Sequence, residues 1–244
     1  MQDKSAEILD LDSKETWHSD FFELINNQWN QVSKDMHEEG KARDFIFKLR
    51  HASGFLQNPK IKSLFEMGME IISKNYSHVI GFHLCRIENP ESYNQKGLLV
   101  PDFSETVNVF KKMFPGAKNV EVELRKLDEE KYLKHNEGTV FFYISRLGIR
   151  DSSYNFSYGG ELFGILADRF DKKARDKIDQ KGKRSLIKFK ISLSWNDVAR
   201  IYDIRSIYVS HVLAEIVRSK RFPTEEYDGF NQGYSVKRNI PPET

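Results

Sequence analysis

The sequence contains a single cysteine, Cys85, among 244 residues. One thiol cannot form an intramolecular disulfide, and it cannot build a structural zinc site that needs several thiolates. The chain also lacks the run of about 18 apolar residues that spans a bilayer, and its first residues, MQDKSAEILDLDSKE, contain no apolar signal core. We therefore expect a cytoplasmic protein in a reducing compartment, with no membrane partner.

Several common catalytic signatures are also missing. The sequence has no Gly-x-Gly-x-x-Gly fingerprint, no Gly-Lys-Ser/Thr loop and no Gly-x-Ser-x-Gly elbow. None of its seven histidines stands four residues from another, so a helical zinc pair is excluded as well. These gaps argue against a phosphate-binding loop of the usual kinds, a serine hydrolase and a metal centre.

Neither sign of charge dominates. The 38 basic and 36 acidic residues give a formal net charge of +2, which neither implies nor excludes a nucleic-acid partner. Aromatic residues make up 13% of the chain, enough to build a sizeable core. The length suits one large domain, or one domain with a helical extension.

The first 76 residues show a helical period. Apolar residues recur at spacings of three and four at Trp17, Phe21, Leu24, Ile25 and Trp29. The same spacing returns over residues 44–56 and 60–74, whereas residues 1–12 are polar and are expected to lack regular structure. We interpret residues 1–76 as an N-terminal helical region.

After Tyr76 the period changes to two. Residues 79–87 alternate as a strand, Asn89-Pro90 ends it, and a short helix over residues 90–96 stops at Gly97. Further strands are expected at 139–147, 184–193 and 233–240, and further helical patterns at 104–114, 119–135, about 160–180 and 205–219. The prediction is an α+β fold in which a small mixed sheet forms a second domain, residues 77–244, behind an N-terminal helical layer.

The strand and its sequel also carry a functional pattern. They contain His83-Leu84-Cys85-Arg86, Asn89, Ser92, Gly97-Leu98-Leu99 and Pro101. This pattern resembles the first NAD-binding strand of the ADP-ribosyltransferase superfamily, in the His-Tyr-Glu branch that includes the poly-ADP-ribose polymerases. That branch commonly has His-Gly-Thr-Arg, so Leu84 stands where glycine is usual.

Two weaker matches extend the resemblance over roughly residues 78–244. The segment Tyr154-Asn155-Phe156-Ser157-Tyr158-Gly159-Gly160-Glu161 is similar to a Tyr-x-x-x-Tyr-Gly-Ser-Glu segment of bacterial relatives, and Asn239-Ile240-Pro241-Pro242-Glu243 looks like the closing strand of such domains. The resemblance implies a split β-sheet of ADP-ribosyltransferase type and NAD as the substrate.

The resemblance also implies a role for each residue. His83 would donate to the 2′-hydroxyl of the adenosine-side ribose, and Tyr154 or Tyr158 would stack on nicotinamide. Glu161 would stabilise the ribose cation that forms as the nicotinamide bond breaks. The backbone of Leu84 would meet the carboxamide, with Cys85 and Arg86 completing the cofactor-binding strand. No metal is required.

Each of these residues also has a structural explanation. A histidine in an apolar strand is often a core group, a buried cysteine often only packs, and Arg86 could pair with Glu88 or Glu91. Glu161 would favour the first turn of a helix through the helix dipole alone. Glu243 is a rival for the catalytic glutamate, and Tyr143 for the stacking role.

Two classes of function remain open from the sequence. The first is an ADP-ribosyltransferase that modifies a macromolecular acceptor, protein or nucleic acid, or an NAD glycohydrolase; by analogy this suits a bacterial toxin or phage-defence effector with an antitoxin or regulatory partner. The second is a non-catalytic nucleic-acid- or protein-binding module on a degenerate transferase fold. In residues 196–221, Arg218, Lys220 and Arg221 could track phosphates, or they could end a core-facing helix.

Overall fold

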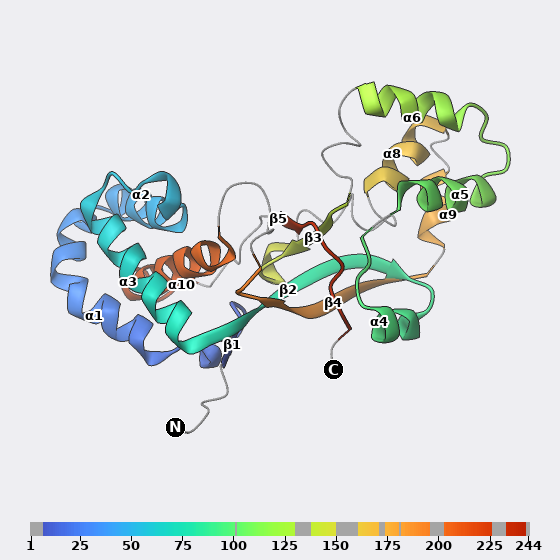
Figure 1. The fold of residues 1–244 in the computed structure, drawn as a ribbon. Helices are drawn as coiled ribbons and strands as arrows, with labels where there is room; N and C mark the ends of the chain where they lie inside the picture. Colours follow the sequence, from blue (N-terminus) through green and yellow to red (C-terminus); the bar gives the residue numbers. More distant parts are fainter. Residues whose placement is uncertain are drawn as a thin grey trace. The chain divides into compact units, whose positions relative to one another are not determined.

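The computed structural model describes residues 7–100, 102–129, 138–149, 161–170, 174–180, 182–195, 203–225 and 233–242. Within those ranges the protein is α+β, with nine α-helices and a small mixed sheet of five strands (Figure 1). The predicted α+β class and the small mixed sheet are confirmed. None of the helices in the described ranges is long and apolar enough to cross a membrane.

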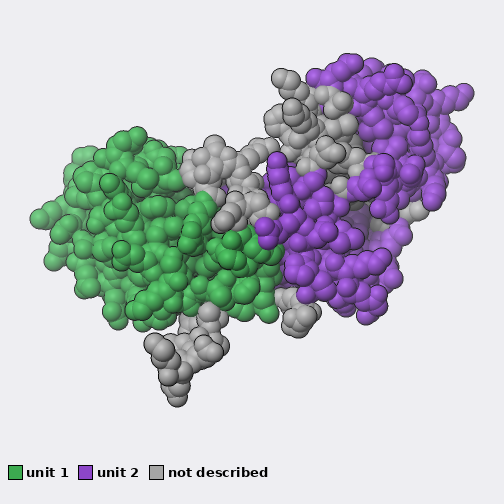
Figure 2. Space-filling model, viewed as in Figure 1, with its two compact units in different colours: residues 1–80, 144–147, 190–230 green, residues 81–143, 148–189, 231–244 purple. Residues whose placement is uncertain are grey.

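The chain divides into two compact units, shown in different colours in Figure 2. Unit 1 contains residues 1–80, 144–147 and 190–230, and unit 2 contains residues 81–143, 148–189 and 231–244. Strand β2, Tyr76–Ile87, starts in unit 1 and continues in unit 2. Both units are therefore assembled from segments that are distant in the sequence.

Strand β2 has partners along its length. Near its start it pairs in parallel with β1, Glu7–Leu9, and further along it pairs antiparallel with β3, Val140–Tyr143. Strand β5, Gly233–Val236, lies antiparallel to β3, and β4, Lys183–Ser192, also pairs with β2. The expectation that residues 1–12 lack regular structure is wrong for β1, which pairs with β2 and buries Leu9 completely.

Unit 1 is built mainly from helices. Its long helices are α1, Ser19–Val32, α2, Glu39–Arg50, α3, Pro59–Asn75, and α10, Ile204–Arg221. The side chain of Asn58 caps α3 by accepting hydrogen bonds from two backbone N–H groups of its first turn. Proline at the first helical position adds to this start signal because its fixed φ suits a helix.

Helix α10 is the central element of unit 1. It packs on α2, α3 and α1, and from Ser206 to Arg218 every one of its residues is buried. The hydroxyl of Tyr208 donates to the backbone carbonyl of Ile80, which ties the helix to the start of β2. A helix buried all round belongs to the core, and this one comes from the distant C-terminal part of the chain.

Unit 2 has a helical core of its own. Helices α5, Phe103–Met113, α6, Val120–Glu129, α8, Glu161–Phe170, and α9, Ala174–Asp179, contribute to it. Its buried members are Val107, Phe110, Phe114, Val120, Leu127, Leu166, Ala167 and Ile178. Where one helix was expected over residues 160–180, the structure has α8 and α9.

Candidate functional site

The imidazole of His83 is oriented by the neighbouring strand. Its Nδ1 lies 2.7 Å from the backbone carbonyl oxygen of Phe141 on β3. A carbonyl only accepts, so Nδ1 carries the proton, and Nε2 of a neutral ring keeps a lone pair. Burial lowers the pKa of His83, and the hydrogen bond to Phe141 offsets this only in part. The ring is therefore mainly neutral at pH 7.

Cys85 is buried and fits its structural explanation. Burial raises the pKa of its thiol to about 11, although a hydrogen bond with the side chain of Tyr93 acts in the opposite direction. Burial also raises the pKa of Tyr93, to about 12. A thiol with so high a pKa is a poor nucleophile at neutral pH. The pair instead joins β2 to α4, Pro90–Lys96, on which Tyr93 lies.

Two other residues of the strand motif are half-buried on β2. Nη2 of Arg86 donates to the backbone carbonyl of Gly182, 3.1 Å away, at the start of the segment that leads into β4. Leu84 is partly covered, and its backbone contact with a carboxamide stays a prediction. Arg86 thus links β2 to a neighbouring segment of unit 2.

The Gly-Leu and Asn-Ile-Pro motifs meet in space. Leu98 and Ile240 form an antiparallel bridge in which each N–H donates to the other residue's carbonyl, at 2.9 and 2.8 Å. The side chain of Asn239 also accepts from the N–H of Val100 at 2.7 Å. Two segments singled out separately by the resemblance therefore lie side by side, although they come from opposite ends of unit 2.

Gly97 has to be glycine for this bridge to form. Its φ is +72°, and a Cβ atom there would stand 2.0 Å from the carbonyl oxygen of Ile240. Both conditions exclude an ordinary side chain. The positive φ ends α4 at this residue, and the close approach leaves no room for a side chain there.

The structure does not describe the side chains of most of the remaining predicted site residues. Tyr154, Tyr158 and Glu243 lie outside the described residues. Glu161 is the first residue of α8, as expected, but its side chain is also outside what the structure describes. Their roles stay predictions. Tyr143, the rival for the stacking role, is buried on β3 opposite Phe82.

The basic end of α10 is occupied by contacts within unit 1. Arg218 donates to the carboxylate of Glu215 and is buried. Lys220 donates to the side chain of Asn26, and Arg221 donates to a backbone carbonyl at 3.2 Å. These contacts favour the interpretation of residues 204–221 as a core-facing helix over a track for phosphates.

Sequence reasoning missed the partners of its candidates. A backbone carbonyl on the next strand, such as that of Phe141, has no side-chain signature. The sequence placed Tyr93 in a short helix but gave no sign of its hydrogen bond with Cys85. Comparisons of the chain with protein-family models, with curated proteins and with solved structures found no match.

Proposed function

We propose that unit 2 binds NAD and that the protein transfers ADP-ribose from it to a macromolecular acceptor, or to water. The observation that carries the proposal is the meeting of the motif segments: His83 is oriented on β2, and the Gly97–Leu98 turn is bridged to Ile240 in the same unit. A directed imidazole on a strand of this unit can hold a sugar hydroxyl, and the bridge brings two of the motif segments together.

The proposed reaction breaks the bond between C1′ of the ribose and the ring nitrogen of nicotinamide. The bonding electron pair stays with the nitrogen, so neutral nicotinamide leaves and positive charge develops on the ribose. A lone pair of the acceptor, or of water, then attacks C1′ and the attacking group loses its proton. NAD is consumed as a substrate, and the developing cation is stabilised by a carboxylate, for which Glu161 is the candidate and Glu243 its rival.

The tautomer of His83 defines its part in this reaction. Because Nδ1 is committed to Phe141, a ribose hydroxyl would donate to Nε2 of the neutral ring, the reverse of the direction that the family resemblance implies. His83 is thus proposed as a positioning group for the sugar. Tyr154 or Tyr158 would cover the nicotinamide ring.

The first test is release of free nicotinamide from NAD by the purified full chain, with and without cell lysate. His83→Ala should raise KM for NAD by about tenfold or more, since a directed hydrogen bond to the sugar is lost. His78→Ala is the matched control on the same strand, where the ring contacts Ser77. No nicotinamide release under either condition, or equal KM in the two variants, would refute the proposal.

The glutamate assignment has a separate test. Glu161→Gln should lower kcat by about 100-fold or more while NAD binding persists, because the charge matters mainly in the transition state. Binding is read from the NAD-dependent rise in melting temperature. If Glu161→Gln keeps full turnover, Glu161 is not the catalytic carboxylate and Glu243→Gln is measured next.

A second candidate function rests on Leu84. Its side chain, where the resembled family has glycine, takes room on β2 and favours a degenerate transferase fold that only binds a partner. Such a protein would show no NAD-dependent rise in melting temperature. A toxin or phage-defence setting, with an antitoxin partner, is an analogy that either candidate accommodates.

A further inference from the structure

Unit 1 contains a cavity that the proposed transferase chemistry does not use. It has a volume of about 190 Å³ and lies along α2 and the C-terminal end of α10. The residues that line it are Arg43, Ile46, Phe47, Arg50, Arg218, Phe222 and Glu225. The lining thus combines three guanidinium groups, one carboxylate and two phenyl rings.

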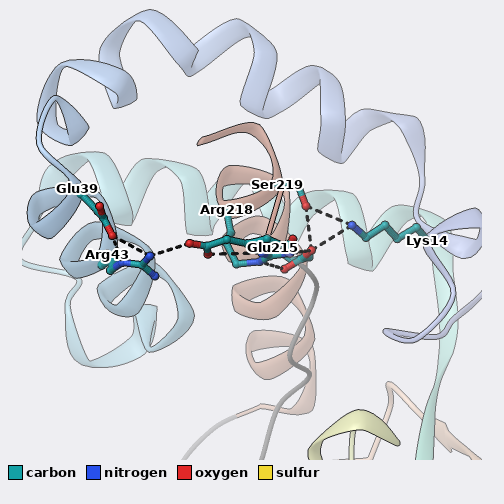
Figure 3. Close-up of polar contacts among 7 residues, drawn as sticks. Lys14, Glu39, Arg43, Glu215, Arg218 and Ser219 are labelled. Atoms are coloured by element: carbon teal, nitrogen blue, oxygen red, sulfur yellow. Dashed lines mark hydrogen bonds and ion pairs between the residues drawn. The ribbon is translucent and has the colours of Figure 1, made fainter. Parts of the chain in front are cut away.

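Arg218 is a buried residue of the cavity lining, and its side chain is held by several hydrogen bonds. Its Nε and Nη2 donate to the two carboxylate oxygens of Glu215, at 2.7 and 2.8 Å, as Figure 3 shows. Burial would raise the pKa of Glu215, but hydrogen bonds from Arg218, Lys14 and Ser219 lower it overall, so the pair is ionised. Nη1 of Arg218 donates to the backbone carbonyl of Glu225 at 3.0 Å.

The side chain of Glu225 is attached less firmly than its backbone. Its carboxylate accepts from Nη2 of Arg43 at 2.7 Å, lies 3.9 Å from Nη1 of Arg218 and is 38% exposed. An ion pair this exposed contributes little, because water and salt screen it. The carboxylate can therefore leave Arg43 while Arg218 keeps the backbone in place.

Arg43 is suited to receive another anion. Its guanidinium lies 4.8 Å from the ring centre of Phe222. Its Nε donates a hydrogen bond to the exposed carboxylate of Glu39. Within the described part of the chain, its hydrogen bonds use Nε and Nη2 and not Nη1. A phosphate offers more charge and more acceptor oxygens than a carboxylate, and it matches the guanidinium fork.

Phe47 supplies a flat apolar surface at the same cavity. Its side chain is 55% exposed, the largest exposure among the large hydrophobic residues of the described chain. The ring contacts that of His51 in a tilted arrangement, with ring centres 4.7 Å apart, and that of Phe55 edge-on. An exposed ring beside arginines suits stacking by a flat ligand ring.

We propose that this cavity binds a small phosphate ester that carries a flat ring, of the nucleoside monophosphate type. The phosphate replaces the carboxylate of Glu225 on Arg43, with Arg50 on the same wall, and the flat ring stacks on Phe47 at the mouth. A cavity of about 190 Å³ has room for the phosphate and for part of the sugar, so the flat ring would lie at its edge. The site is distinct in its residues from the NAD site proposed in unit 2.

Calorimetric titration of the full chain at low salt tests the proposal, with adenosine 5′-monophosphate as the probe and adenosine as its uncharged counterpart. The monophosphate should bind and adenosine should bind at least about tenfold more weakly, because the arginine contacts need the anion. Arg43→Gln should weaken monophosphate binding by about tenfold or more. Arg205→Gln, an exposed arginine of unit 1 paired with Asp203, should leave it unchanged.

Removing the charge of Glu225, which competes with the phosphate for Arg43, tests the site most directly. Glu225→Gln should strengthen monophosphate binding by up to about fivefold, because it removes the internal anion and keeps the backbone carbonyl. Phe47→Ala should weaken binding of the monophosphate and spare that of inorganic phosphate. Arg43→Lys provides a second variant if Arg43→Gln does not fold, and it should still weaken binding because it loses the fork.

Three results would overturn this site. They are equal binding of adenosine and the monophosphate, weaker binding by Glu225→Gln, and unchanged binding by a folded Arg43 variant. His83→Ala should leave monophosphate binding intact. Loss of binding in His83→Ala would move the ligand to unit 2 and refute the cavity in unit 1, whereas failure of nicotinamide release alone leaves the cavity proposal standing.

Discussion

At the scale of single residues, Gly97 and Gly138 share one backbone conformation and differ in their surroundings. Both have φ of +72°, but a Cβ atom at Gly97 would strike the carbonyl of Ile240, whereas at Gly138 it would meet nothing within 4 Å. Gly138→Ala should cost about 1–2 kcal/mol from the left-handed conformation alone. Gly97→Ala should cost at least about 1–3 kcal/mol more, measured as free energy of unfolding in urea. Equal costs would show that the Leu98–Ile240 bridge is not tight.

Single residues also mark the limit of what the sequence can predict about the site. The alternation in residues 79–87 and the spacing of the motif located His83 and Gly97 correctly on a strand and a helix end. The partner of each was hidden, since Phe141 and Ile240 contribute backbone carbonyls and any residue type could supply those. The direction of the hydrogen bond at His83 could therefore be assigned only from the three-dimensional structure.

At the scale of elements, the contact between α3 and α10 depends on Gly68. A Cβ atom there would lie 2.6 Å from a methyl carbon of Val209 and 3.0 Å from one of Leu213. Gly68→Ala should destabilise the protein by about 1–3 kcal/mol through overpacking. Gly40→Ala on α2, with nothing within 4 Å, should stabilise it by about 0.5–1 kcal/mol. Urea unfolding of both variants checks the opposite signs.

Recovery of the lost stability in the double variant Gly68→Ala, Val209→Ala would assign the cost to this one contact. If Gly68→Ala alone is neutral, the helices can separate at low cost and α10 is less tightly packed than the structure indicates.

Elements with strong local signals were predicted well. Helix α4 has its predicted bounds because Asn89 caps it, Pro90 opens it and Gly97 ends it. Strand β3 was expected to reach residue 147 but ends at Tyr143. Beyond it, Ser145 donates to the carboxylate of Asp12 at 2.6 Å, a distant partner that no local pattern reveals.

At the scale of the whole molecule, buried histidines make stability depend on pH. Burial lowers the pKa of His211 well below its ordinary value, and the charges of Arg50 and His51 lower it further. In the unfolded chain His211 takes up a proton near pH 6.5, whereas in the folded chain it stays neutral to a lower pH. Its contribution to the free energy of unfolding is therefore fully present above pH 6.5 and is lost progressively as the pH falls below that value. The pKa of His83 is lowered in the same direction.

His211→Gln should reduce the slope of unfolding free energy against pH, between about pH 6.5 and 5, by up to about 1.4 kcal/mol per pH unit. Urea unfolding at several pH values measures it. An unchanged slope would mean that His211 takes up its proton in the folded protein.

The interleaving of the two units has a consequence for how the gene can be divided. The chain enters unit 2 at residue 81 and returns to unit 1 for residues 144–147 and again for residues 190–230, and α10 lies in the second of these stretches. A truncated gene that stops before codon 190 would encode the N-terminal bundle without its central helix, and the complementary fragment would expose that helix to solvent. Neither half should accumulate as a soluble product when expressed alone, whereas co-expression of both should reconstitute the whole.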